Sequence, residues 1–219
     1  LLANTNLAIS VRNAFGIKPI PTVYPKYGQP VSISDSYPWR TSNGFHTVFR
    51  FSDLPREYFN VFDSTAIVEI FDEKSCLLKR LILDDLSLSN ELLVNQDLLD
   101  GHAGYGSFYV YHTSEKELNA DFRIKHRSYV GFSLNNQLPS FFHGNIQSRY
   151  LDIRSGKIGK NLMQQSLRKQ NYRIQNYFKD LDKVELFFIN PLSKKISFTV
   201  NNLNFSLEGD ASMIVDLSG

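Results

Sequence analysis

The sequence contains a single cysteine, Cys76, among its 219 residues. One thiol can form neither an internal disulfide nor a zinc site built on several cysteines, so both kinds of stabilised scaffold are excluded. A lone cysteine fits a reducing compartment, from which we expect a cytoplasmic location. Because Cys76 lies inside an apolar strand-like run, we predict that it is a small core residue rather than a nucleophile.

Other absences narrow the function. No apolar run approaches the roughly 18 residues that a membrane-spanning helix requires, so we expect no membrane span. The formal net charge is only +2, which argues against a dedicated nucleic-acid-binding protein. The sequence has no P-loop, no dinucleotide fingerprint, no Gly-x-Ser-x-Gly elbow and no His-Glu-x-x-His pair, and we expect no cofactor.

Proline is concentrated near the start of the chain, where five of the eight prolines lie before residue 40. Because proline fixes φ and has no N–H to donate, this stretch should contain neither a helix nor a central strand. We predict that residues 1–44 form an extended arm that packs on the body through its tyrosines and Trp39. An edge strand is expected within it, over residues 7–11.

From Phe45 onward, apolar and polar residues alternate with the period of two that is typical of half-buried strands. Clear examples are residues 45–51, 65–71, 76–83, 107–112, 128–134, 184–189 and 195–200. Short polar segments at 72–75 and 190–193 indicate two hairpins. The pattern predicts a mostly β protein, an antiparallel β-sandwich or barrel whose core is dominated by phenylalanine and tyrosine.

Residues 160–178 break the strand pattern. Their apolar residues recur near helical spacing among good helix formers, which predicts one amphipathic helix. The two hairpins have similar order, strand length and turn chemistry, which either reflects an internal repeat or the general likeness of β-meanders. If the repeat is real, the body consists of two β-sandwich halves, 45–126 and 127–219, with the helix inserted in the second.

Cationic and amide side chains stand beside aromatic residues at several predicted strand ends. Guanidinium groups bind carboxylates and phosphates, and aromatic rings stack on the apolar faces of sugars. We therefore predict a site for a small anionic or sugar-like ligand. Its candidate residues are Arg123, His126, Arg127, Tyr129, His143, Asn145, Arg149 and Tyr150. The alternative is that these residues are solvated strand ends and turn residues.

Histidines are the candidate metal ligands, since strand-borne histidines can converge on an ion. The best set is His46, His112 and His143, although none of the five histidines has another within a few residues. Such a site would favour an alternative function, a metal-dependent or acid/base enzyme that acts on carbohydrates.

Charge is unevenly distributed along the chain. Residues 63–100 hold nine acidic and three basic residues, whereas residues 147–180 hold eight basic and two acidic ones. Opposite patches of this kind can meet between copies, so we expect a homo-oligomer. The function that we predict is that of a non-catalytic ligand-binding or self-assembling β-sandwich module.

Overall fold

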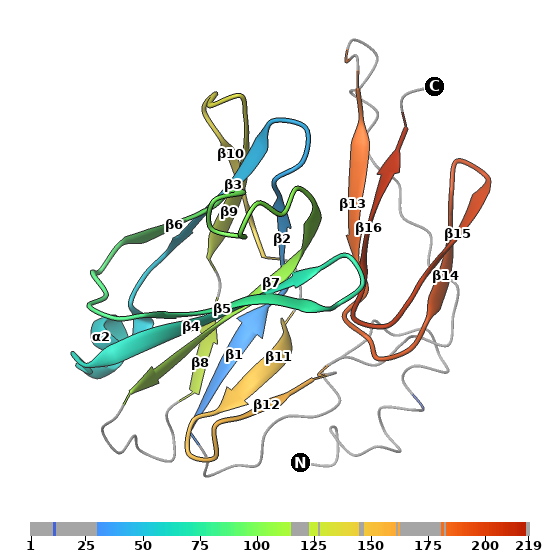
Figure 1. Ribbon diagram of the computed structural model, residues 1–219. Helices are drawn as coiled ribbons and strands as arrows, with labels where there is room; N and C mark the ends of the chain where they lie inside the picture. Colours follow the sequence, from blue (N-terminus) through green and yellow to red (C-terminus); the bar gives the residue numbers. More distant parts are fainter. Residues whose placement is uncertain are drawn as a thin grey trace.

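The computed structural model describes Val11 and residues 30–114, 123–126, 128–144, 147–160, 162, 181 and 183–217. The fold of these residues is mostly β, with one short helix, α2 (Leu54–Phe59), beside the sheets (Figure 1). The predicted fold class is confirmed. Of the two predicted architectures the structure has facing sheets, and no sheet among the described strands closes into a barrel.

Three four-stranded sheets make up the body. The central sheet has the order β2 (Tyr37–Arg40), β7 (Tyr105–Ser114), β4 (Ser64–Asp72) and β5 (Leu77–Leu83). The β3 sheet has the order β10 (Ser140–His143), β9 (Tyr129–Leu134), β3 (Phe45–Phe51) and β6 (Asn90–Val94). The β1 sheet has the order β12 (Lys157–Gly159), β11 (Gln147–Asp152), β1 (Val31–Asp35) and β8 (Arg123–His126). Their pairings are antiparallel except that of β1 with β8.

Strands β4 and β7 of the central sheet are buried on both faces because this sheet lies between the other two, whereas its edge strand β5 is partly exposed (Figure 1). Its first face packs on the β3 sheet, where the rings of Tyr37, Phe49 and Phe108 contact one another at 4.9–5.2 Å between centroids. Its second face packs on the β1 sheet, where Tyr109 and Leu151 belong to one cluster. An aromatic core thus holds the sandwich together, as the composition predicts.

Strand β1 corrects the prediction that the proline-rich segment holds no central strand. All five residues of β1 are buried, and β1 lies between β11 and β8. The reason is that the prolines flank β1, so its N–H groups remain available for pairing. Pro38 lies in β2, which is an edge strand, where proline is tolerated. The strand expected over residues 7–11 lies outside the described residues, apart from Val11.

The chain crosses from the β1 sheet to the central sheet between β1 and β2. Strand β7 is longer than its partner β2. The pairing of the two strands ends where Tyr37 faces Phe108, and β7 continues past this point. Two serines of β1 then replace the missing strand: Ser34 Oγ accepts from the Val110 N–H at 2.8 Å, and Ser32 Oγ accepts from the His112 N–H at 2.9 Å. The alternating serines of β1 therefore join two layers.

The hairpin predicted at residues 72–75 is confirmed, since β4 pairs with β5. Asp72 organises its turn by accepting from the N–H groups of Lys74 and Cys76. The prediction that Cys76 lies in the core is wrong, because β5 begins at Leu77 and leaves Cys76 exposed in the turn.

The hairpin predicted at residues 190–193 is wrong. Strand β13 (Glu185–Ile189) pairs with β16 (Ser212–Asp216), and β14 (Ile196–Val200) pairs with β15 (Leu203–Leu207). The two-residue turn Asn201-Asn202, with φ values of 46° and 65°, closes the inner pair, because asparagine tolerates the positive φ that such hairpin turns require. Residues 183–217 are called the C-terminal unit below.

The two hairpins on which the internal repeat was predicted therefore differ in strand pairing. The division at residues 126 and 127 stays a prediction, although β3 and β6 pair in one sheet with β9 and β10 from beyond it. The helix predicted over 160–178 lies outside the described residues, apart from Lys160 and Leu162. Within the described part of the chain, no helix is long and apolar enough to cross a membrane.

Candidate functional site

The outward face of the β3 sheet carries an exposed cluster of rings and one guanidinium, here called the aromatic platform: Arg50, Tyr129, Phe141 and His143. Arg50 faces Tyr129 across β3 and β9, and Tyr129 faces His143 across β9 and β10. Directly opposed residues share a face of the sheet, so these side chains form one row. The rings of Tyr129 and His143 lie 4.2 Å apart between centroids, and Arg50 Cζ lies 4.6 Å from the centre of the Phe141 ring.

Gly131 keeps the platform flat. It faces Phe141 on β10 and Val48 on β3, so it occupies the middle of the sheet. A Cβ at this position would lie 3.0 Å from the Phe141 ring, closer than ordinary van der Waals contact. Because glycine has no side chain, the Phe141 ring can lie across the strand. Tyr129 remains 49% exposed, and this ring is accessible to a ligand.

A cavity of about 190 Å³ lies beside the platform, between the β3 sheet and the C-terminal unit. Its lining is mainly apolar and consists of Ser36, Pro38, Phe142, His143, Phe187, Ile189 and Pro191. The Ser36 hydroxyl is already engaged, since its Oγ lies 2.7 Å from Ser148 Oγ. His143 belongs to both features, so the cavity adjoins one end of the platform.

His126, a predicted ligand-binding residue, lies in the core instead. Its ring is 0% exposed, and its Nε2 lies 3.0 Å from Nε2 of the equally buried His112. Burial is the main reason that the pKa of His126 falls well below its ordinary value, and His112 lowers it further. Burial likewise lowers the pKa of His112 to about 4. Both rings are therefore neutral at pH 7 and face no solvent.

Arg149 is also buried, with its guanidinium between the rings of Phe71 and Tyr109. Arg149 Cζ lies 4.5 Å and 3.8 Å from the two ring centres. Its Nη2 pairs with Asp210 of the C-terminal unit at 3.3 Å. The neighbouring Tyr150 packs in a different cluster, beside Val31 and Ile33 of β1.

The predicted ligand-binding set is thus divided among separate places. Tyr129 and His143 come together on the platform, whereas His126 and Arg149 are buried in the body and Tyr150 is partly buried. Arg123 lies on β8, in the β1 sheet. Arg127 and Asn145 are outside the described residues. Sequence reasoning missed Arg50 and Gly131, because only the strand register brings them next to Tyr129 and Phe141.

The candidate metal ligands do not converge. His46 lies on β3 opposite Ser133, His112 is buried against His126, and His143 belongs to the platform. No group of three or more histidine, cysteine, aspartate or glutamate side chains that could hold a metal ion occurs among the residues that the structure describes. The physical reason is that strand order, not spacing in the chain, decides which histidines meet.

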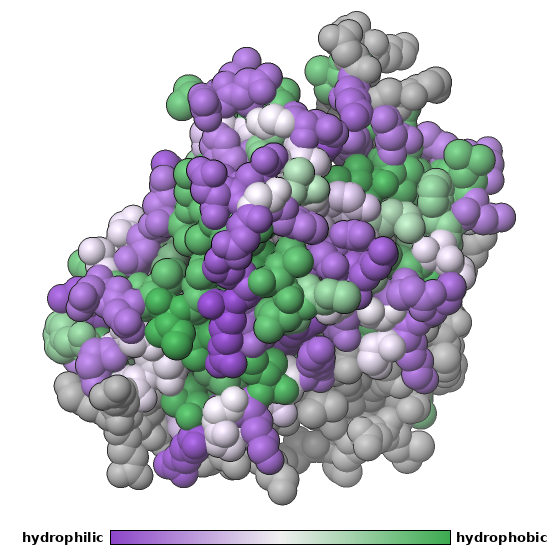
Figure 2. All heavy atoms as spheres, in the orientation of Figure 1, coloured by the Kyte–Doolittle hydropathy of each residue, from purple (hydrophilic) through white to green (hydrophobic). Residues whose placement is uncertain are grey.

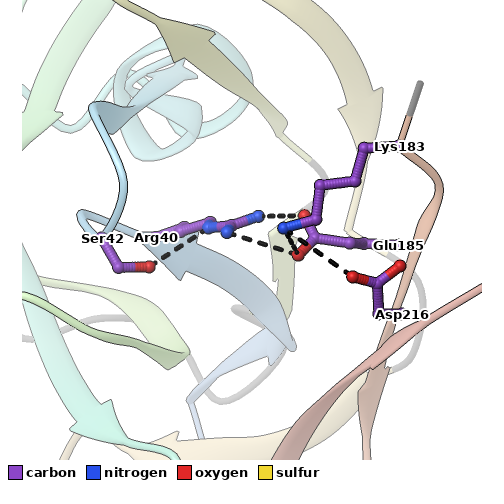
Figure 3. Close-up of polar contacts among 5 residues, drawn as sticks. All are labelled: Arg40, Ser42, Lys183, Glu185 and Asp216. Atoms are coloured by element: carbon purple, nitrogen blue, oxygen red, sulfur yellow. Dashed lines mark hydrogen bonds and ion pairs between the residues drawn. The ribbon is translucent and has the colours of Figure 1, made fainter. Parts of the chain in front are cut away.

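An ion-pair network joins the C-terminal unit to the body (Figure 3). Arg40 of β2 contacts both carboxylate oxygens of Glu185, and Lys183 pairs with the same carboxylate at 2.9 Å. Burial raises the pKa of Glu185, but the hydrogen bonds and charges of Arg40 and Lys183 outweigh it and hold the pKa below its ordinary value. This network positions the strand that lines the cavity beside the platform.

The aromatic platform carries groups that can contribute stacking contacts and hydrogen bonds. Its ring faces offer stacking surfaces, and Arg50 with its partner Glu91, at 2.8 Å, offers hydrogen-bond donors and acceptors at the rim. Both partners are about half exposed, so they can exchange this contact for a ligand. Comparisons with the models of known protein families, with curated proteins and with solved structures found no match to this chain.

Proposed function

We propose that this protein is a non-catalytic β-sandwich module that binds a sugar-like ligand on its aromatic platform. The observation that carries the proposal is the contact of the Tyr129 and His143 rings at 4.2 Å on an open sheet face. Soluble proteins normally bury large aromatic rings, so rings aligned on an exposed, rigid face are suited to a partner.

A sugar fits this surface better than a flat apolar molecule does. The C–H face of a pyranose ring can stack on Tyr129 or Phe141, while its hydroxyl groups reach the surrounding polar side chains. Arg50 and Glu91 lie at one side of the platform, and His143 lies at the other. Arg50 and Glu91 largely cancel each other's charge, which favours a neutral oligosaccharide over an anionic one.

Titration calorimetry against cellohexaose, xylohexaose, maltohexaose and oligogalacturonate tests this function. We expect at least one of the three neutral oligosaccharides to bind more tightly than the anionic oligogalacturonate, and Tyr129→Ala to weaken its binding about fivefold to tenfold, the loss expected for one stacked ring. Tyr58→Ala is the matched control, because Tyr58 lies on α2 and is 69% exposed. The proposal fails if none of the four binds, or if both tyrosine variants lose affinity equally.

Self-association is a second property that we propose, on a different surface. Hydrophobic side chains gather over the middle of the face where β4 and β5 cross (Figures 1 and 2). β5 is an edge strand, and its Leu77 and Ile82 are 52% and 63% exposed. An exposed apolar edge strand can pair with the same strand of a second copy.

Sedimentation velocity over a range of concentrations tests the association, with Ile82→Lys as the interface variant. We expect a dimer in the native chain and a monomer in the variant. A native chain that stays monomeric at the highest concentration contradicts this proposal and leaves the sugar-binding proposal unaffected.

The expected cytoplasmic location rests on the single cysteine alone, and localisation of a tagged chain in cells tests it.

A further inference from the structure

Arg149 is bound to the protein through only part of its guanidinium. Its side chain is 1% exposed, and Nη2 contacts one oxygen of Asp210, whereas Nε and Nη1 have no hydrogen-bond partner. Phe71 and Tyr109 hold the group from two sides. A guanidinium presents its N–H groups to an oxyanion along two edges, Nε with Nη2 and Nη1 with Nη2. The contact of Nη2 with Asp210 therefore leaves one donor of each edge unused.

Other unpartnered polar atoms lie on the sheet face that Arg149 contacts and next to Asp210 in the sequence. Ser107, Tyr109 and Tyr111 alternate along β7 and so share the face on which Arg149 stacks, and each of their hydroxyls lacks a partner. The Ser212 hydroxyl, two residues from Asp210, lacks one as well. Burial raises the pKa of Tyr111 well above its ordinary value, so its hydroxyl keeps its proton. Every atom of the group can donate a hydrogen bond, and leaving several such donors buried and unpaired is costly.

Each charged side chain near Arg149 is offset by a partner of opposite charge. Arg80 lies 3.9 Å from Glu69, which faces Tyr109 across the sheet, so these two charges offset each other. Asp210 offsets the charge of Arg149 in the same way. If the Asp210 carboxylate moved away, the group would hold a net positive charge among hydroxyl donors.

We propose that Arg149, Tyr109 and Tyr111 form an internal oxyanion site, which the Asp210 carboxylate occupies only in part when the C-terminal unit is docked. A small oxyanion such as inorganic phosphate replaces Asp210 when the turn that carries it swings out. Phosphate oxygens then accept from Nη2 of Arg149 together with Nε or Nη1, and from the tyrosine hydroxyls. The C-terminal unit can release this turn because several of its contacts with the body are polar, namely those of Arg40, Arg149 and Glu73.

Thermal unfolding of the full chain in millimolar phosphate, against chloride at equal ionic strength, tests the site. Asp210→Asn removes the competing carboxylate, so its melting temperature should rise with the logarithm of the phosphate concentration above Kd, by about 3 °C at tenfold excess over Kd. The native chain should respond less. Arg149→Met should not respond, and Arg154→Met, which removes an exposed arginine near the end of the same strand, should behave like the native chain.

Tyr111→Phe in the Asp210→Asn background keeps the assay informative if Arg149→Met does not fold. It removes one donor and keeps the ring, and we expect it to reduce the phosphate response of Asp210→Asn. Equal phosphate responses in every variant would mean that phosphate acts only through the general exclusion of salts from protein surfaces, and would overturn the proposal. Asp210→Asn without a phosphate response would overturn it too.

Discussion

The Nε2 atoms of His112 and His126 face each other at 3.0 Å in the interior, with their rings stacked. One nitrogen must donate and the other accept, so the two rings differ in tautomer. The Ser128 hydroxyl lies 2.9 Å from His126 Nδ1 and can donate to it, which lets His126 Nε2–H donate to His112. The proton of His112 then lies on Nδ1, and burial lowers the pKa of His112 more than the backbone of Ser52 raises it.

This pair should make the fold sensitive to acid. The pKa of His112 is about 4 in the folded chain and about 6.5 in the unfolded chain, so the unfolded state binds more protons between these values. Stability is therefore complete above pH 6.5 and falls as the pH drops toward 4, by roughly 3 kcal/mol for this residue alone. Urea unfolding at pH 7.5, 5.5 and 4.5 measures the loss.

His112→Phe should flatten this pH dependence, because the unfolded chain then gains one proton fewer. His46→Ala is the control, since His46 lies on the outward side of β3 and takes no part in the pair. A pH dependence that His112→Phe leaves unchanged would show that other groups cause the acid sensitivity.

The serines of β1 should matter more than exposed serines do. Ser34→Ala removes the acceptor of the Val110 N–H and leaves that buried group unpaired, at a cost of about 1–3 kcal/mol. Ser197→Ala on β14, where the serine is exposed, should change stability by less than about 0.5 kcal/mol. Chemical denaturation of both variants compares them, and equal effects would contradict the role given to Ser34.

The contact between Arg40 and Glu185 should hold the C-terminal unit in place. Arg40→Met leaves a partly buried carboxylate without its main partner, and we expect a loss of about 1–3 kcal/mol in docking. Hydrogen exchange should become faster over residues 183–217 while β4 and β7 stay protected. Lys195→Met is the control, because it breaks an exposed ion pair with Glu208 and should leave hydrogen exchange unchanged. If Arg40→Met accelerated hydrogen exchange equally in every strand, a local role of Arg40 would be contradicted.

Gly106 should tolerate no side chain. A Cβ there would collide with the carbonyl oxygen of Phe71, which already accepts a 2.7 Å hydrogen bond from Trp39 Nε1. Gly106→Ala should therefore cost more than about 2 kcal/mol, since neither the backbone nor the fully buried indole can yield. Gly131→Ala should cost less, because a Cβ there would lie 3.0 Å from both the Phe141 ring and the Ser140 carbonyl oxygen, so its neighbours need to move much less. Similar melting temperatures for the two variants would refute this ranking.

Several strands could be predicted from the sequence because the direction of a side chain alternates along one strand, which is a local property. Phe45–Phe51 is found with the predicted bounds, and the Asp72 turn is found where its polar residues indicate it. The same local logic failed for β13, whose partner β16 lies beyond a complete hairpin. Nothing in the alternation of β13 distinguishes β16 from β14.

The candidate site was predictable in part for the same reason. Tyr129 and His143 belong to strands that are adjacent in sequence, so their grouping needed only one hairpin. Arg50 joins them through the pairing of β3 with β9, two strands that are far apart in the sequence. His126 and Arg149 are buried, but histidine and arginine are usually surface residues, so nothing in the sequence indicated this.

The order of apolar and polar residues thus determined that this chain forms strands around an aromatic core, because burial of alternate side chains follows from backbone geometry alone. The tertiary structure decided which strands became neighbours, and with them which polar groups came to face solvent, a ring or another charge. That choice depends on the packing of whole layers, in which the free energy of each contact is set by residues far away in the chain.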